Sequence, residues 1–171
     1  MLAFLTVGST RFDSLVSFAF GDEFLSSLRT KGFTSLVIQC GNSAFELADN
    51  PQNGEKRYLK RGGVDIEYWK FHPALDEEYR KADLIISHAG SGTILEVLRM
   101  GKPLIVVPNP TLLDNHQQEL ASALQTMGYL ATTTVEELPA VVEHFPFQMN
   151  TFPPFDPSRF ARVVDEAMGF I

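Results

Sequence analysis

The sequence predicts an α/β fold built on a doubly wound, mainly parallel β-sheet with helices on both faces. Two observations support this prediction: short, continuous apolar runs recur along the chain, and helical patterns separate them. Strands that are covered by helices on both faces typically read as uninterrupted apolar runs. Their alternation with helices indicates right-handed crossovers and a ligand crevice at the carboxyl ends of the strands.

The first half of the chain contains three predicted strands and two helical patterns. The strands are predicted at residues 2–7, 35–40 and 64–71. The first two are apolar, and the third is rich in aromatic and β-branched side chains, which favour strands. The apolar spacing predicts one helix over residues 15–32 that passes Gly21, and a proline favours the start of a short helix over 73–81. Residues 41–57 are polar and turn-rich, and we expect an irregular loop there.

The second half of the chain continues the alternation. Strands are predicted at residues 83–87, 103–107 and 129–132, and helices at residues 93–100, 114–127 and 136–143. Gly101 and Gly128 follow two of these helices directly, at the position where a left-handed residue commonly ends a helix. Residues 1–143 therefore form one predicted domain of ordinary size.

The chain changes character after residue 143. Residues 144–157 contain four prolines and four phenylalanines, and prolines neither continue a helix nor pair inside a sheet. We predict an extended strap there, whose phenylalanines are available to anchor a partner. An amphipathic C-terminal helix is predicted over residues 158–171, because its apolar residues recur at helical spacing.

The composition disfavours several classes of protein. The chain has 14 Lys and Arg residues against 21 Asp and Glu residues, a net charge of −7, which disfavours nucleic acid and anionic lipids as partners bound through charge. Its single cysteine, Cys40, cannot form an intrachain disulfide, and this suits a cytosolic compartment. We interpret Cys40 as a packing residue and not as a nucleophile. No leader and no stretch near the roughly 20 apolar residues of a membrane span are expected.

Two glycine-containing loops follow predicted strands and mark the expected crevice. The first loop consists of Gly8, Ser9 and Thr10, and the second of Gly90, Ser91, Gly92 and Thr93. Small residues leave backbone amides accessible, and a helix N-terminus carries a partial positive charge, so either loop can hold a phosphate without Lys or Arg. Tight turns without a ligand are the alternative, but two such loops at strand ends favour ligand binding.

The second loop does not match the common nucleotide or hydrolase motifs. It lacks the third glycine of the dinucleotide fingerprint, which disfavours NAD. The chain contains no Gly-Lys-Ser or Gly-Lys-Thr, which excludes a Walker A site for ATP. A hydrolase elbow requires G-x-S-x-G, whereas Ala89 and Thr93 stand two residues before and after Ser91. A serine hydrolase is therefore disfavoured.

Three polar residues near these loops each have a structural alternative. Glu96 stands three residues after Thr93, and this capping-box spacing by itself favours a helix cap. Gln117 and Gln118 have the same spacing from two preceding polar residues. Because adjacent glutamines cannot both serve one cap, at least one is available to pair with sugar hydroxyls. The four histidines show no metal-binding spacing, and no metal is expected.

The chain carries three motifs in order over residues 1–131: FLTVGSTRFDSLV, ADLIISHAGSGTILEVLRMGKPLIVVPN and DNHQQELA. These motifs resemble the cytosolic catalytic subunits of the eukaryotic UDP-N-acetylglucosamine transferases of asparagine-linked glycosylation. More broadly, the chain is similar to the C-terminal, donor-binding half of glycosyltransferase family 28. The resemblance implies a Rossmann-like domain that forms one half of a glycosyltransferase B architecture. Residues 109–113 depart from the bacterial pattern, which is shorter there.

The resemblance implies a role for each candidate residue. The diphosphate of a UDP-sugar is expected between the first loop and the amides of the second. Glu96 is expected to accept hydrogen bonds from the ribose hydroxyls, and the backbone at Phe71 and His72 to read the uracil edge. Gln117 and Gln118 are expected to hold the donor sugar. All of these are assigned by resemblance and not by spacing.

The resemblance also implies a reaction and a partner. N-acetylglucosamine is expected to move from UDP-GlcNAc to dolichyl-diphosphate-GlcNAc by an inverting transfer without metal or cofactor. The acceptor half is expected in a membrane-anchored subunit that forms a heterodimer with this chain at the cytosolic face of the endoplasmic reticulum. Inversion requires a base, for which this chain offers no convincing candidate; His88 and His116 are considered only as helpers to leaving-group charge. A non-catalytic nucleotide-sugar-binding regulatory module is the alternative.

The predicted C-terminal helix generates a first experiment. Removing residues 158–171 is expected to reduce capture by the membrane-anchored partner more than it reduces UDP binding, because an apolar stripe outside the sheet suits an interface. Pull-down and UDP titration on the same truncated protein measure both effects. Unchanged capture together with a lower unfolding temperature would assign the helix to the packing of its own domain.

Overall fold

A seven-stranded sheet lies at the centre of the structure, a computed structural model that describes residues 1–45, 51–52, 54–111 and 116–154. The strands are β1 (Leu2–Thr6), β2 (Ser35–Gln39), β3 (Arg57–Arg61), β4 (Val64–Trp69), β5 (Leu84–His88), β6 (Leu104–Val107) and β7 (Ala131–Thr132). Their order across the sheet is β3-β4-β2-β1-β5-β6-β7. All neighbours pair in parallel except β3 and β4. The predicted doubly wound, mainly parallel sheet is confirmed.

The strand order reverses direction between β1 and β5. From β1 the chain first builds outward to β2 and β4, and then returns to place β5 on the other side of β1. At such a reversal, the loops after the two neighbouring strands diverge to opposite faces of the sheet and leave a crevice outside its carboxyl edge. The loops after β1 and β5 are the two glycine loops of the sequence.

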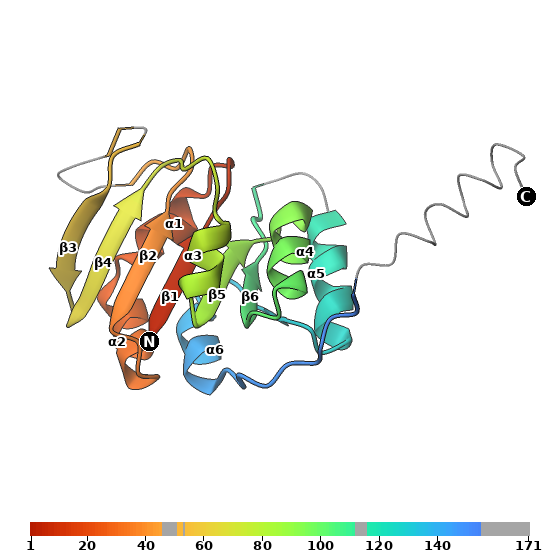
Figure 1. The fold of residues 1–171 in the computed structure, drawn as a ribbon. Helices are drawn as coiled ribbons and strands as arrows, with labels where there is room; N and C mark the ends of the chain where they lie inside the picture. The colour runs from red at the N-terminus through yellow and green to blue at the C-terminus, as the bar shows by residue number, and fades with distance from the viewer. Residues whose placement is uncertain (46–50, 53, 112–115, 155–171) are drawn as a thin grey trace, which may run out of the picture.

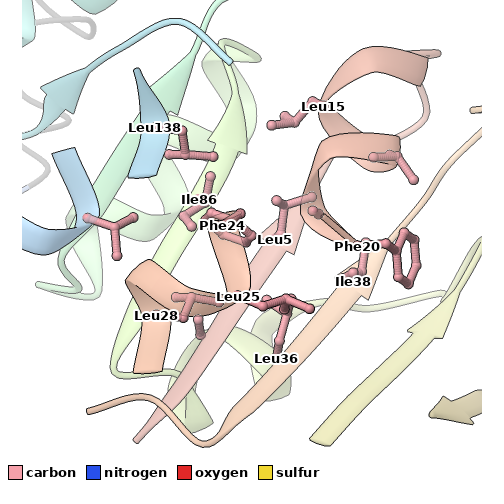
Figure 2. Packing of buried hydrophobic residues seen from close by; sticks show 14 of the residues in the cluster. Leu5, Leu15, Phe20, Phe24, Leu25, Leu28, Leu36, Ile38, Ile86 and Leu138 are labelled. Atoms are coloured by element: carbon pink, nitrogen blue, oxygen red, sulfur yellow. The ribbon is translucent and has the colours of Figure 1, made fainter. Parts of the chain in front are cut away.

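Helices cover both faces of the sheet (Figure 1). They are α1 (Asp13–Ala19), α2 (Asp22–Thr30), α3 (Asp76–Lys81), α4 (Ser91–Arg99), α5 (His116–Thr126) and α6 (Leu138–His144). The buried side chains of α1, α2 and α6 pack on one face, and those of α3, α4 and α5 pack on the other. Figure 2 shows the first of these layers, in which Leu5, Ile38 and Ile86 of the sheet meet Phe24 and Leu138 of the helices.

The helix predicted over residues 15–32 is wrong in one respect, because it is two helices. The chain leaves the helical conformation at Gly21, which is extended and stands at the N-cap of α2. The amide of Gly21 donates to the carbonyl of Phe18 at 2.8 Å and closes the last turn of α1. The bend lets α1 and α2 both face the sheet, and the apolar spacing continues across it, which explains why the sequence pattern missed the break.

The strand β3 was not predicted. It forms a hairpin with β4 through Gly62 and Gly63, which both have positive φ angles of 56° and 79°, a conformation that favours tight hairpin turns. Because β3 lies at the edge of the sheet, most of its side chains are exposed and its sequence is polar. The glycine pair was the signal that an antiparallel hairpin precedes β4.

The described part of the strap packs onto its own domain. Phe145 is only 2% exposed, and the ring of Phe147 lies 5.6 Å from it and 6.2 Å from the ring of Phe33. Phe152 makes an edge-to-face contact with Tyr129 at 5.2 Å. The prediction that these rings are available to anchor a partner is therefore wrong for Phe145, whose ring belongs to the core.

The remaining predicted elements differ from the structure mainly at their ends. The short helix α3 begins at Asp76, three residues after the predicted proline start, and β7 spans only two residues. The helix predicted over residues 158–171 lies outside the described residues. Within the described ranges, no helix combines the length and the apolar character that a bilayer crossing requires.

Candidate functional site

A cavity of about 410 Å³ opens beside the loops that follow β1 and β4 and the first turns of α4. It is lined by Gly8, Ser9, Gln39, Phe71, His72, Pro73, Ala74, Leu75, Asp76, Tyr79, Thr93 and Glu96. Six of these residues were candidates from the sequence: Gly8, Ser9, Phe71, His72, Thr93 and Glu96. The fold therefore brings residues from three separate segments of the chain to one cavity.

The first glycine loop lines this cavity, and its carbonyls accept hydrogen bonds from the protein. The carbonyl of Gly8 accepts from Gln39 Nε2 at 2.8 Å, and those of Ser9 and Thr10 accept from Asn42 Nδ2 at 2.9 Å and Asn42 N at 3.0 Å. A carbonyl facing an anion would repel it, and here all three carbonyls already have donors. Among the described residues, Ser9 N–H has no acceptor and is available to an anion.

The second glycine loop forms the N-terminus of α4. Gly90 is the extended N-cap residue, and no side chain in the described structure caps this helix. The amides of Ser91, Gly92 and Thr93 have no acceptor within the helix, because the first turn lacks them. A side chain at Gly92 would meet nothing within 4 Å, so the space beside Gly92 is open. Of this loop, only Thr93 lines the first cavity in the described structure. The amides of these three residues carry the partial positive charge of the helix end.

The capping-box alternative for Glu96 is wrong. The N-cap is Gly90 and not Thr93, and Glu96 is the sixth residue of α4, too far along to cap it. Its exposed side chain lines the cavity instead. Beside it, burial raises the pKa of Tyr79 to about 12, against an opposing hydrogen bond with the side chain of Thr93. Glu96 is therefore free to accept hydrogen bonds from a ligand.

His88 fills the space beneath both glycine loops. Its side chain is buried, and a Cβ atom added to Gly8 would lie 2.8 Å from His88 Cε1, while one added to Gly90 would collide with His88 Nε2. A side chain at either position would therefore displace the ring of His88. Burial lowers the pKa of His88, and the Thr6 backbone opposes this only in part, so the imidazole is mainly neutral at pH 7. His116, the other helper, is the first residue of α5.

The loop after β4 supplies the third side of the cavity. Nδ1 of His72 lies 2.8 Å from the carbonyl of Ala74, and its ring lies 5.7 Å from that of Trp69. The carbonyl of Lys70 accepts from Gln39 Nε2 at 2.6 Å and from Gly41 N at 3.1 Å. The backbone that precedes Phe71 and His72 is thereby tied to the end of β2.

Gln117 and Gln118 line a second cavity, of about 660 Å³. The segment that follows β1 borders both cavities, since Gly8 and Ser9 of the loop line the first and Ser14 at the start of α1 lines the second. Most of the other lining residues are hydroxyl, amide or carboxylate residues: Asn109, Ser122, Thr132, Thr133, Thr134, Glu136 and Glu137. Within the described part of the chain, Gln117 Oε1 and Thr133 Oγ1 are buried and have no hydrogen-bond partner. The residues proposed to cap these glutamines, 114 and 115, lie outside the described residues.

The described residues contain no group of three His, Cys, Asp or Glu side chains that lie close enough to hold a metal ion. Cys40 is completely buried, and burial raises the pKa of its thiol to about 12. A thiol in this state is a poor nucleophile, so the interpretation of Cys40 as a packing residue is confirmed.

The sequence analysis missed two polar residues that shape the first cavity. Gln39 is the one amide in the apolar run that forms β2, and its position at the carboxyl end of that strand was the available signal. Asn42 lies in the stretch predicted to be an irregular loop. Its two hydrogen bonds to the first glycine loop connect segments 32 and 33 residues apart in sequence, and no local pattern reveals such a contact.

Comparisons with known proteins point to one family. The model of the glycosyltransferase family 28 C-terminal domain matches residues 2–155. A Cryptococcus neoformans protein named UDP-N-acetylglucosamine transferase subunit ALG13 is 38% identical, over 97% of this chain and 96% of that protein. An NMR solution structure of ALG13 covers 95% of this chain and 93% of its own, with a TM-score of 0.66 at 28% identity. Acinetobacter baumannii MurG shares the fold, with a TM-score of 0.54 at 22% identity over 96% of this chain and 41% of its own.

The buried state of His88 predicts a pH dependence of stability. Its pKa is below the ordinary value of 6.5, so at lower pH the unfolded chain binds a proton that the folded chain does not. Stability is therefore expected to fall as the pH drops through about 6.5. The variant His88→Asn lacks this pH-dependent contribution to stability. In urea unfolding, the difference in the free energy of unfolding between wild type and variant should therefore be smaller at pH 5.5 than at pH 7.5.

A matched control is His144→Asn, which replaces an exposed histidine on α6. The stability difference for this variant is measured at the same two pH values and serves as the reference. A constant difference for His88→Asn would contradict the buried, neutral state of His88.

Proposed function

The chain belongs to glycosyltransferase family 28, and on this premise we propose that it is the catalytic, donor-binding subunit of an N-acetylglucosaminyltransferase. The donor is UDP-GlcNAc and the acceptor is dolichyl-diphosphate-GlcNAc, so the product is the chitobiosyl lipid of N-glycan precursor synthesis. One observation carries the proposal: a single cavity joins the first glycine loop, the Phe71–His72 segment and the start of α4.

The nucleotide lies in the first cavity. Its diphosphate receives hydrogen bonds from Ser9 N–H and from the free amides at the start of α4, which together offer positive partial charge without a cationic side chain. Glu96 accepts hydrogen bonds from the ribose hydroxyls, and the exposed position of its side chain supports this role. The backbone at Phe71 and His72 faces the uracil edge.

The donor sugar extends toward the second cavity. Gln117 and Gln118 line it, and an amide side chain both donates and accepts, as pairing with sugar hydroxyls requires. The unpartnered Oε1 of Gln117 and Oγ1 of Thr133 support a polar occupant, because buried polar atoms normally have hydrogen-bond partners.

The transfer is an inverting displacement. The acceptor hydroxyl attacks the anomeric carbon, the bond from that carbon to the β-phosphate oxygen breaks, and UDP leaves with the electron pair. The amides around the diphosphate stabilise the charge that develops on UDP. A base takes the proton of the acceptor hydroxyl. The proposal assigns this base to the partner subunit, because His88 is buried against Gly8 and Gly90.

The acceptor site belongs to a membrane-anchored partner that forms a heterodimer with this chain. The relatives of this chain are named as subunits. The part of MurG that shares this fold is 41% of the MurG chain, so MurG contains a further part that this chain does not match. The partner recruits the chain to the cytosolic face of the endoplasmic reticulum, and the C-terminal residues 158–171 contribute to the contact.

Reconstitution tests the proposal. The chain is combined with the membrane-anchored acceptor subunit, labelled UDP-GlcNAc and the lipid acceptor, and labelled disaccharide-lipid is expected only when both subunits are present. Donor binding without any transfer in the reconstituted complex would favour a non-catalytic nucleotide-sugar-binding module instead.

The ribose contact predicts the effect of Glu96→Ala. Loss of hydrogen bonds to a charged acceptor is expected to weaken UDP binding by about 1.5–3 kcal/mol. The unfolding temperature should change little, because Glu96 caps no helix. Calorimetric titration with UDP and thermal unfolding measure the two effects.

A matched control is Glu143→Ala, which removes the same charge from α6 and lies outside the lining of both cavities. It should leave UDP affinity unchanged. Equal losses in the two variants would show that long-range charge, and not a ribose contact, governs the affinity.

The amide cradle predicts donor binding without a divalent metal. UDP titrations in EDTA and in Mg²⁺ are expected to give the same affinity, because backbone amides supply the charge stabilisation that a metal provides elsewhere. UDP binding that disappears in EDTA and returns with Mg²⁺ would overturn the cradle as the source of diphosphate affinity.

A further inference from the structure

The side-chain amide of Gln39 connects two loops of the nucleotide cavity. Gln39 is the last residue of β2 and is 2% exposed. Its Nε2 donates to the carbonyl of Gly8 at 2.8 Å and to the carbonyl of Lys70 at 2.6 Å. One NH₂ group therefore holds the loop after β1 and the loop after β4 at the same time.

The chemistry of its partners determines the orientation of this amide. Both carbonyls can only accept, so the nitrogen must face them, and the amide oxygen accepts from the hydroxyl of Thr6 at 2.5 Å. The same hydroxyl accepts from the amide of Gly8 at 3.1 Å. The amide and the carbonyl of Gly8 thus both belong to one hydrogen-bond network with Thr6 and Gln39. Hydrogen bonds in such a network polarise and strengthen one another.

Close packing around the network leaves the two loops little freedom. Gly41 has a φ angle of 55°, and a Cβ atom there would lie 2.6 Å from the carbonyl oxygen of Gly8 and 2.7 Å from that of Thr10. The amide of Gly41 also donates to Lys70 O at 3.1 Å. The end of β2 therefore packs closely against the loop after β1, and Gln39 donates hydrogen bonds to that loop and to the loop after β4.

We propose that Gln39 is a positioning residue that sets the distance between the diphosphate loop, residues 8–10, and the uracil loop, residues 71–72. The inference rests on the proposed function of this cavity as a UDP site. A ligand that spans two subsites gains affinity only when their separation matches its length. Gln39 thereby selects a nucleoside diphosphate over either of its halves.

The test compares a spanning ligand with its two halves. Dissociation constants for UDP, uridine and inorganic pyrophosphate are measured by NMR titration of wild type and Gln39→Met, which keeps the size of the side chain and removes all three hydrogen bonds. The variant should bind UDP roughly tenfold or more weakly, while the affinities for uridine and pyrophosphate each change by less than about threefold.

Asn42→Ala is the matched control. Among the described residues, the side chain of Asn42 bonds to the diphosphate loop alone, through Ser9 O at 2.9 Å. This variant should weaken UDP and pyrophosphate by the same factor and leave uridine unchanged. The control thus distinguishes two effects: a local disturbance of the diphosphate loop, and a change in the distance between the diphosphate loop and the uracil loop.

A second variant guards against loss of the fold. Gln39→Glu keeps the length of the side chain and an acceptor for Thr6, but places a carboxylate oxygen against two carbonyls, so the same selective loss of UDP is expected. Equal weakening of all three ligands in either folded variant, or failure of both variants to fold, would overturn the positioning role. UDP binding by the wild type is measured before any variant is compared. If the wild type does not bind UDP, the proposed function itself is refuted.

Discussion

The pairing of β1 with β2 on one side and β5 on the other determines the geometry of the candidate site. Thr6, at the end of β1, is in register with Gln39 of β2 and Ser87 of β5. Because the neighbouring side chains of β1 are buried on both faces of the sheet, β1 cannot slide or rotate without exposing its core residues. The loop that follows β1, which supplies Gly8 and Ser9 to the first cavity, therefore starts from a fixed position between β2 and β5.

Of the residues that the structure describes, no Lys or Arg lines the first cavity. The chain has a net charge of −7, yet its candidate diphosphate site is built from amides whose partial charges act only at short range. The carbonyls that would oppose an anion are occupied by Gln39 and Asn42. A neutral His88 beneath the loops is consistent with this arrangement, since a buried cation there would require its own counter-ion. In the proposed diphosphate site, local backbone dipoles thus supply the attraction that the overall charge of the chain opposes.

The two cavities that candidate residues line differ in how their polar groups are paired. Hydrogen bonds of Gln39 connect the loops beside the first cavity, whereas the second cavity is lined by Gln117 and Thr133, whose buried oxygen atoms have no hydrogen-bond partner within the described part of the chain. A rigid nucleotide site suits a group that stays bound throughout the reaction. Unpartnered side chains suit the part of the site where the sugar, the acceptor and the partner subunit meet.

From the sequence alone, the parallel sheet and half of the twelve residues that line the first cavity could be predicted. Continuous apolar runs and glycine loops are local signals of buried strands and accessible amides, and they indicated the sheet, Gly8, Ser9 and Thr93, whereas Phe71, His72 and Glu96 came from the resemblance to a family. The sequence did not reveal the break at Gly21 or the edge strand β3, since the apolar spacing continues across the first and a solvent-exposed strand needs no apolar pattern. The choice between cap and ligand contact for Glu96 also needed the structure, which shows where α4 begins. Only the tertiary structure decided that Gln39 and Asn42 hold the loops, because their partners are distant in sequence and meet them only when β1, β2 and β4 pair.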